Sequence, residues 1–82
     1  MYYVYILQSL KDGRYYKGQT NDLDRRLNEH NRGEEKSTAP YIPWKLVWST
    51  ALTDRADALA LEKKIKNITR RARLQPFIKK YV

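Results

Sequence analysis

The sequence predicts an α+β fold, an α/β sandwich in which a small three-stranded, mainly antiparallel sheet is flanked by two to three helices in the order β-β-α-β-α-α. Three observations lead to this prediction. Residues 2–8 and 44–50 are rich in β-branched and aromatic side chains, as strands are. An Asp-Gly pair follows the first of these segments and is typical of a hairpin. Two later segments repeat apolar residues at the helical spacing of three and four.

The first two strands, residues 2–8 and 14–17, are expected to form a β-hairpin. The Asp-Gly pair between them predicts a type I′ turn, because glycine tolerates a positive φ. Such a hairpin can bring Tyr5 and Tyr16 close together. Gly18 is expected to end the second strand at a place where a side chain would obstruct the chain or a ligand.

A first helix is predicted over residues 22–31, and the Asn-Asp pair at its start provides the N-cap. Leu23 and Leu27 lie four apart on one face, and Arg26 and His30, also four apart, project from a neighbouring face. The strand tyrosines would therefore lie near an arginine and a histidine. Arginine offers fixed donors for phosphate oxygens, and tyrosine and histidine can each transfer a proton. These side chains predict a site for phosphodiester chemistry, provided that they share one surface.

The segment 33–43 is expected to be irregular because it contains two prolines and a Ser-Thr pair. It is either a plain connection or a functional loop. In the second case, Lys36, Ser37, Thr38 and Tyr41 would contact a phosphate backbone.

Residues 44–50 predict the third strand, with Trp44, Leu46 and Trp48 on the face that packs against the core. An exposed tryptophan would instead stack on a nucleic-acid base. The core interpretation is favoured because large aromatic side chains dominate the interior of small domains.

A second helix is predicted over residues 54–66, with Ala58 and Ile65 on its apolar stripe. Glu62 lies at the edge of this stripe, and from the local sequence alone it is a partner in a surface ion pair. Residues 67–82 predict a short third helix capped by Thr69.

The charge balance favours a polyanionic partner. The 82 residues hold 17 Lys and Arg against nine Asp and Glu, which leaves a formal charge of +8. Nucleic acid fits this excess better than an anionic membrane, because the basic C-terminal region offers only a short apolar face. The candidate nucleic-acid-binding residues are Lys17, Lys36, Lys63, Lys66, Arg70 and Arg71.

Other totals limit the class of protein. No apolar run approaches the ~20 residues that span a bilayer, and no signal peptide is recognisable, so no membrane association is expected. The absence of cysteine excludes a disulfide framework and a thiolate zinc site. A single cytoplasmic domain over residues 1–82 is the expectation.

Two short motifs on the predicted hairpin resemble a known family. Tyr3-Val4-Tyr5 and Tyr16-Lys17-Gly18 are similar to the GIY and YIG motifs, and ten residues separate Tyr5 from Tyr16. The chain thereby resembles the GIY-YIG endonuclease superfamily, in particular its small stand-alone members. It departs from the family at Tyr3, where the family has glycine, and at Lys17, where the family has isoleucine.

The resemblance implies a divalent-metal-dependent endonuclease that hydrolyses phosphodiester bonds in DNA, with structure-selective cleavage in repair or recombination as one expected role. It implies that Glu62 binds a single Mg²⁺ or Mn²⁺ ion and that Arg26 binds the scissile phosphate. It assigns the general base to Tyr16, with Tyr5 and His30 orienting it or sharing its proton.

The sequence leaves two alternatives open. A free phenol has a pKa of about 10 and imidazole about 6.5, so His30 is a competing general base to Tyr16. The second alternative is a non-catalytic, basic nucleic-acid-binding module, because nothing in the chain provides sequence readout or a targeting domain. A protein partner would then supply the targeting, and neither the oligomeric state nor the choice of DNA over RNA follows from the sequence.

Overall fold

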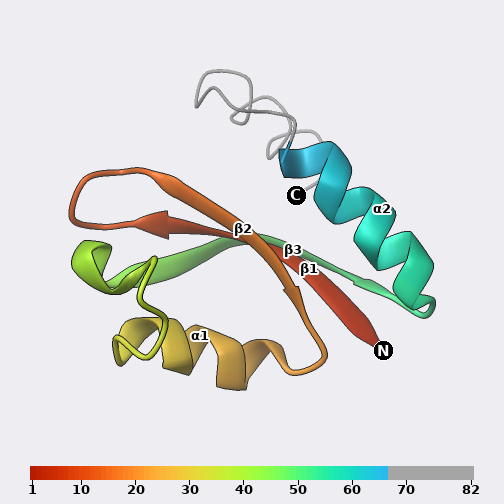
Figure 1. The fold of residues 1–82 in the computed structure, drawn as a ribbon, viewed down its shortest axis with the longest axis horizontal. Coiled ribbons are helices and arrows are strands. Elements are labelled where there is room, and N and C mark those ends of the chain that lie inside the picture. The colour runs from red at the N-terminus through yellow and green to blue at the C-terminus, as the bar shows by residue number, and fades with distance from the viewer. Residues whose placement is uncertain (67–82) are drawn as a thin grey trace.

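The computed structural model describes residues 1–66, which form a β-β-α-β-α arrangement (Figure 1). The third helix expected beyond Lys66, together with Arg70 and Arg71, lies outside the described residues. The α+β class and the order of the first five elements are confirmed. The elements are β1 (Tyr2–Ser9), β2 (Tyr15–Thr20), α1 (Leu23–Asn31), the short 3₁₀ helix η1 (Ala39–Tyr41), β3 (Trp44–Leu52) and α2 (Arg55–Lys66).

The sheet has the strand order β2-β1-β3, and both neighbouring pairs are antiparallel. β1 is therefore the central strand, hydrogen-bonded on both edges. The expectation that Gly18 ends the second strand is wrong, since β2 continues to Thr20. Gly18 pairs directly with Tyr5 of β1, and its missing side chain makes room for the tyrosine ring above it.

The turn between β1 and β2 differs from the predicted type I′ hairpin. A type I′ turn requires a positive φ at both of its central residues. Gly13 adopts a φ of 81°, but no other residue of this turn has a positive φ. The connection is a longer loop in which the Gly13 amide donates to the Ser9 carbonyl at 2.9 Å. The buried Ser9 hydroxyl oxygen also accepts from the amides of Lys11 and Asp12, at 3.1 and 3.2 Å.

The two helices cover opposite faces of the sheet (Figure 1). This follows from the alternation of side chains along β1, whose neighbouring residues point to opposite faces. The face toward α2 carries a core of Val4, Ile6, Trp48, Ala58 and Ile65. The face toward α1 carries Tyr5, Leu7 and Trp44, with Tyr16, Leu23, Leu27 and Tyr41 packed against them.

A β-bulge in β3 separates the two tryptophans. Ile6 pairs with Trp48 while the next residue of β1 pairs with Leu46, so Val47 is an extra residue on β3. Trp44 and Trp48 are both buried, at 4% and 6% exposure, which confirms their core role. The prediction that both share one face with Leu46 is wrong, because the bulge places Trp48 on the face toward α2 while Trp44 and Leu46 stay on the face toward α1. Leu46 is exposed there and does not belong to the core.

Side-chain hydrogen bonds fix both helices in place. The Asp22 carboxylate caps α1 by accepting from the Arg25 amide at 3.1 Å, and Asp54 caps α2 through the Ala56 amide at 2.8 Å. Near the end of α1, the Asn31 amide bonds both the backbone N–H and the carbonyl of Trp44, at 2.6 and 3.0 Å. These two bonds join α1 to the start of β3.

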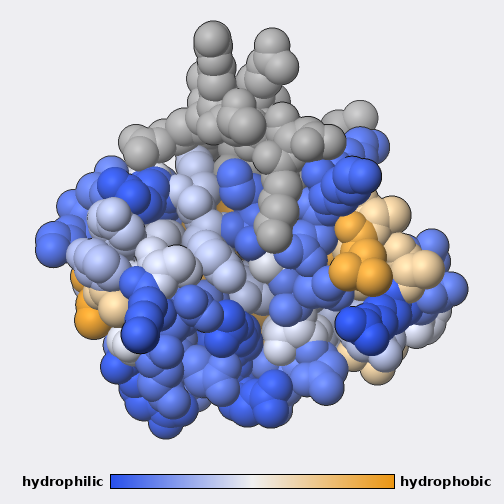
Figure 2. All heavy atoms as spheres, viewed as in Figure 1, coloured by the Kyte–Doolittle hydropathy of each residue, from blue (hydrophilic) through white to orange (hydrophobic). Residues whose placement is uncertain are grey.

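The surface of the face shown in Figure 2 is mostly hydrophilic, with apolar side chains confined to small patches. Within residues 1–66, neither helix has the length and apolar character needed to cross a lipid bilayer.

Candidate active site

Two tyrosines from neighbouring strands lie on the sheet face that α1 covers. Tyr5, on the central strand, is 1% exposed, and its ring centroid lies 6.3 Å from that of Tyr16. The close approach that the sequence predicted across the hairpin is therefore present. It depends on Gly18, since a Cβ atom there would lie 2.7 Å from the Tyr5 hydroxyl oxygen and 2.8 Å from its Cζ.

His30 sits beneath the two tyrosines at the end of α1 and is fully buried. Its Nε2 lies 3.1 Å from the Tyr5 hydroxyl, and its Nδ1 lies 2.8 Å from the Thr38 hydroxyl. Thr38 donates its single hydroxyl proton to the Glu35 carbonyl at 3.3 Å. With the proton placed there, the Thr38 oxygen accepts from Nδ1–H and Nε2 accepts the Tyr5 proton. Each group donates to the next, from Tyr5 to His30 and from His30 to Thr38, and the Glu35 carbonyl accepts the last proton.

The surroundings of these hydrogen-bonded residues favour the uncharged forms of Tyr5 and His30. Burial lowers the pKa of His30 below its ordinary value of 6.5, and the nearby positive charge of Arg26 lowers it further. Burial raises the pKa of Tyr5 to about 12, although Arg26 beside its hydroxyl opposes the change. Near neutral pH, Tyr5 is thus a protonated donor and His30 an uncharged acceptor. A protonated His30 stabilised by the helix dipole, as a helix-end histidine would be, does not fit this environment.

Tyr16 is the member of the aromatic group that reaches solvent. Its ring centroid lies 4.8 Å from that of His30 and 6.4 Å from that of Trp44. Tyr16 is half-buried, whereas Tyr5 and His30 are closed off. Packing therefore fixes the Tyr16 ring without enclosing it.

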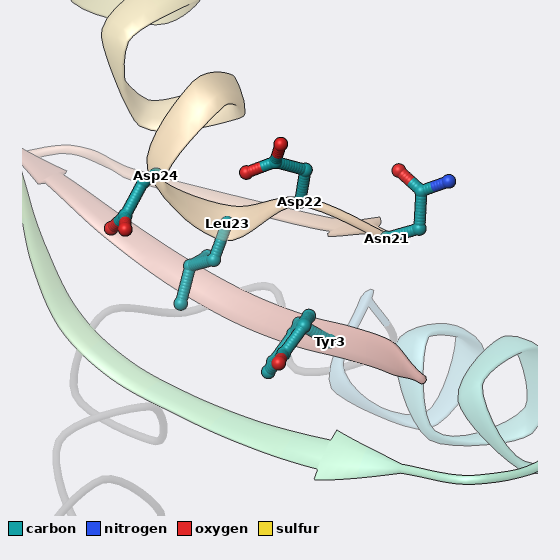
Figure 3. A pocket seen from close by; sticks show the side chains of 5 residues that line it. All are labelled: Tyr3, Asn21, Asp22, Leu23 and Asp24. Carbon is teal, nitrogen blue, oxygen red and sulfur yellow. The ribbon is translucent and has the colours of Figure 1, made fainter.

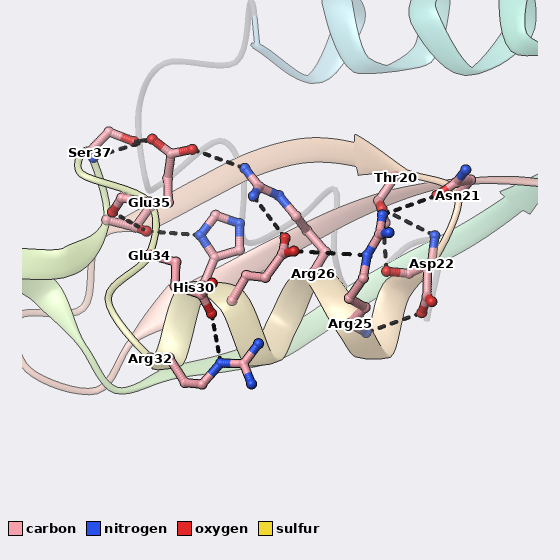
Figure 4. Close-up of polar contacts among 12 residues, drawn as sticks. Thr20, Asn21, Asp22, Arg25, Arg26, His30, Arg32, Glu34, Glu35 and Ser37 are labelled. Carbon is pink, nitrogen blue, oxygen red and sulfur yellow. Dashed lines mark hydrogen bonds and ion pairs between the residues drawn. The ribbon is translucent and has the colours of Figure 1, made fainter.

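Arg26 joins this group from the middle of α1, but its side chain is less open than an exposed helical position would be. It is 25% exposed, and its guanidinium contacts the Glu29 and Glu35 carboxylates, each at 3.1 Å (Figure 4). Burial lowers the pKa of Arg26, but its contacts with Tyr5, Glu29 and Glu35 outweigh burial and raise it. Arg26 is therefore a permanent, oriented cation that already contacts two carboxylates through its Nη1 and Nη2 groups.

Glu62 comes from α2 and is half-buried. Its negative charge is among the effects that raise the pKa of Tyr5, so the carboxylate is close enough to act on that phenol. Within residues 1–66, no group of three or more His, Cys, Asp or Glu side chains is placed to hold a metal ion. A single carboxylate does not fit zinc, which needs three or four protein ligands. It fits Mg²⁺ or Mn²⁺, since such ions keep several waters and take further oxygen ligands from a bound phosphate.

The candidate nucleic-acid-binding residues are spread over several elements. Lys17 is half-buried on β2 and, as the partner of Ile6, lies on the sheet face toward α2. Lys36 and Lys63 are exposed, on the loop after α1 and on α2, and Lys66 is the last residue of α2. Arg70 and Arg71 fall outside the described residues.

Two residues of the site could not be assigned to it from the sequence. Thr38 was expected as a phosphate contact, but it is buried and hydrogen-bonded to His30. Glu35 binds Arg26 across nine positions of the chain, a pairing that requires the folded loop. Glu29 lies three residues after Arg26 on the same helix, and that spacing alone could have indicated the pair.

The buried neutral state of His30 predicts that stability falls in mild acid. The unfolded chain binds a proton near pH 6.5 while the folded chain resists it, so the free energy of unfolding is expected to fall as the pH drops below about 6.5. The slope has a limit of about 1.4 kcal/mol per pH unit for one proton. Urea unfolding at pH 7.5, 6.5 and 5.5 measures it. The chain has one histidine, so His30→Gln should remove this slope; an unchanged slope in that variant would contradict the prediction.

Comparisons with known proteins identify the family of this chain. The GIY-YIG catalytic domain family matches residues 1–75. A UPF0213 protein of Streptococcus agalactiae is 41% identical over 73 residues, covering 88% of this chain and 82% of that protein. A UPF0213 protein of Halalkalibacterium halodurans is 39% identical over 75 residues, covering 90% of this chain and 79% of that protein. The solution NMR structure of a UPF0213 protein from Bacillus halodurans is similar with a TM-score of 0.58 and 38% identity, over 94% of this chain and 83% of that chain. The chain therefore belongs to the GIY-YIG catalytic domain family, as its two tyrosine motifs indicated.

Proposed function

We propose that this protein is a divalent-metal-dependent endonuclease that hydrolyses phosphodiester bonds in DNA. One observation carries the proposal: four side chains converge on one side of the sheet, namely Tyr5, Tyr16, Arg26 and His30. The negative charge of Glu62 also acts on the Tyr5 phenol. This set offers a proton acceptor, a cation for phosphate and a carboxylate for a metal ion, which are the groups that phosphodiester hydrolysis uses.

Arg26 is the proposed ligand of the scissile phosphate. Glu29 and Glu35 hold its guanidinium in a fixed orientation and keep it charged. Guanidinium binds phosphate with the same paired geometry as carboxylate. A phosphate oxygen can therefore take the place of the Glu35 carboxylate, which comes from a loop, while Glu29 stays in place on the helix.

Tyr16 is the proposed general base, and its competitor His30 is disfavoured by its contacts. Both ring nitrogens of His30 are engaged, by Tyr5 and Thr38, and the residue is closed to solvent. Tyr5 holds its own proton up to a pKa of about 12. Tyr16 alone of the three reaches the surface where a water molecule could approach. Tyr5 and His30 then position the Tyr16 ring by packing against it.

Glu62 is the proposed ligand of a single Mg²⁺ or Mn²⁺ ion. When bound, such an ion polarises a phosphate oxygen and lowers the pKa of a coordinated water. The contribution of Glu62 itself is a carboxylate anchored on α2, the helix that packs against the opposite face of the sheet from α1.

Cleavage assays with a Glu62→Ala variant test the proposal. Branched, flapped and single-stranded DNA are incubated with Mg²⁺ or Mn²⁺, and binding is measured separately. We expect Glu62→Ala to lower the cleavage rate at least about a hundredfold, because metal assistance contributes several kcal/mol, while DNA binding persists. Asp57→Ala is the matched control, since it removes an exposed carboxylate from the same helix and should leave cleavage unchanged.

A second function, DNA binding without cleavage, is favoured by one observation. The Arg26 guanidinium is already bound by two carboxylates, so any phosphate must compete for it. A module of this kind would bind DNA through its basic surface and depend on a protein partner for targeting. Binding without cleavage under both metals would support it over the nuclease. Salt sensitivity does not separate the two, because salt weakens either form of binding.

A further inference from the structure

An open pocket of about 460 Å³ lies where the end of β2 meets the start of α2. Its lining consists of Tyr2, Gln19, Thr20, Asn21 and Arg55. The tyrosine and histidine cluster of the candidate active site lies outside this lining. The pocket is therefore a separate feature of the surface.

A second pocket, of about 290 Å³, lies beside the first and shares Asn21 with it (Figure 3). Its remaining lining residues are Tyr3, Asp22, Leu23 and Asp24. Two carboxylates without a lining cation disfavour a polyanion there. The two neighbouring pockets thus differ in sign, and only the larger one suits phosphate.

Arg55 gives the larger pocket its charge. Residues 1–66 contain five arginines, and four of them, Arg14, Arg25, Arg26 and Arg32, form ion pairs with carboxylates. Arg55 forms no ion pair with any residue of this described part, and it is exposed at the first position of α2. Its guanidinium is therefore available to an external anion without displacing an internal carboxylate.

The other lining residues offer neutral hydrogen-bonding groups. The side-chain amide of Gln19 makes no hydrogen bond to another residue within 1–66. The side-chain oxygen of Asn21 accepts from Arg25 at 3.3 Å, so the side-chain NH₂ group of Asn21 is left as a donor. Tyr2 packs against the core and presents an aromatic surface at the pocket wall. Amides read base edges, and aromatic rings support stacked bases.

The position of Arg55 relates this pocket to Glu62. The two residues are seven apart on α2, close to two full helical turns, so they lie on the same side of the helix about 10 Å apart. A B-form strand carries one phosphate per about 3.4 Å of helix axis. One strand that passes along α2 can therefore present a phosphate to Arg55 and another, about three phosphates away, near Glu62.

We propose that the pocket lined by Tyr2, Gln19, Asn21 and Arg55 is a second binding site for the DNA strand, which takes a phosphate on Arg55 and the attached base against Tyr2 and the two amides. This inference rests on the proposed function for the identity of the ligand. The inference also gives the path of the DNA strand, which runs along α2 from the region of Glu62 to Arg55 in the first turn of the helix.

Binding of a fluorescent single-stranded oligothymidylate, measured by anisotropy in EDTA so that no cleavage occurs, tests the site. Arg55→Ala is expected to weaken binding about fivefold, as the loss of one well-formed exposed ion pair would. It should also reduce the slope of log affinity against log salt by about 0.7, which is one phosphate contact on a single strand. Lys64→Ala is the matched control, because Lys64 is an exposed cation on the opposite side of the same helix.

A greater loss for Arg55→Ala than for Lys64→Ala supports the site, and equal losses overturn it. In a titration followed by NMR, the side-chain NH₂ signals of Gln19 and Asn21 should shift in the unmodified protein, and unmoved signals would also overturn the site. These outcomes are separable from cleavage. A strand site with no cleavage under Mg²⁺ or Mn²⁺ leaves this inference standing and removes the nuclease; cleavage with equal losses does the reverse.

Discussion

Replacing Tyr16 by phenylalanine is expected to lower the rate of DNA cleavage about 10²- to 10⁴-fold, the usual contribution of a positioned proton acceptor. The ring would keep its packing against His30 and Trp44, because only the hydroxyl of this half-buried residue is removed. The free energy of unfolding should therefore stay close to that of the unmodified protein. Single-turnover cleavage and urea unfolding, measured on the same preparation, separate the two effects.

The control is the same substitution at the other tyrosine. Tyr5→Phe removes the donor to His30 Nε2 and leaves a buried ring nitrogen without its partner, which costs about 1–3 kcal/mol of stability. Its effect on the rate should be smaller, since Tyr5 acts through the position of its neighbours. If Tyr5→Phe abolished cleavage and Tyr16→Phe preserved it, the assignment of the general base would be wrong.

A Gly18→Ala substitution is expected to destabilise the protein by about 1–3 kcal/mol, the usual cost of overpacking a closed interior. The added methyl group would lie 2.7 and 2.8 Å from the hydroxyl oxygen and Cζ of Tyr5. The Tyr5 ring has little freedom to move, because it is buried and hydrogen-bonded to His30. The expected sign is informative, since replacing a strand glycine by alanine ordinarily stabilises by roughly 0.5–1 kcal/mol.

A double-mutant cycle identifies the cause of this effect. In a Tyr5→Leu background the ring is absent, so Gly18→Ala should cost little or even stabilise the protein. Urea unfolding of the four proteins gives the coupling energy. A cost that is equal in both backgrounds would show that the contact between Gly18 and Tyr5 is not responsible.

The fold class was predictable from the sequence because its signals are local. The Asn-Asp pair predicted the N-cap of α1, which Asp22 provides. The faces of the sheet were harder to predict, since the alternation of Trp44, Leu46 and Trp48 assumes an unbroken strand. The extra residue Val47 reverses that alternation, and no local sequence pattern predicts this bulge.

The site divides in the same way. The hairpin and the helical period were enough to predict that Tyr5, Tyr16 and His30 approach one another. Two further hydrogen-bond partners come from the irregular loop after α1, which supplies Glu35 to Arg26 and Thr38 to His30. Their positions depend on how the loop folds back, which has no repeating sequence signal.

Glu35 serves Arg26 and His30 together, since its carboxylate binds the guanidinium and its carbonyl receives the Thr38 proton that ends the hydrogen-bond chain of His30. The charges of Arg26 and Glu35 also shift the proton affinity of His30 in opposite directions. An anion seated on Arg26 and a proton taken up by His30 are consequently linked ligands, and thermodynamic reciprocity makes each change the other's affinity by the same factor. An anion bound at Arg26 would therefore change the pKa of His30 without contacting it.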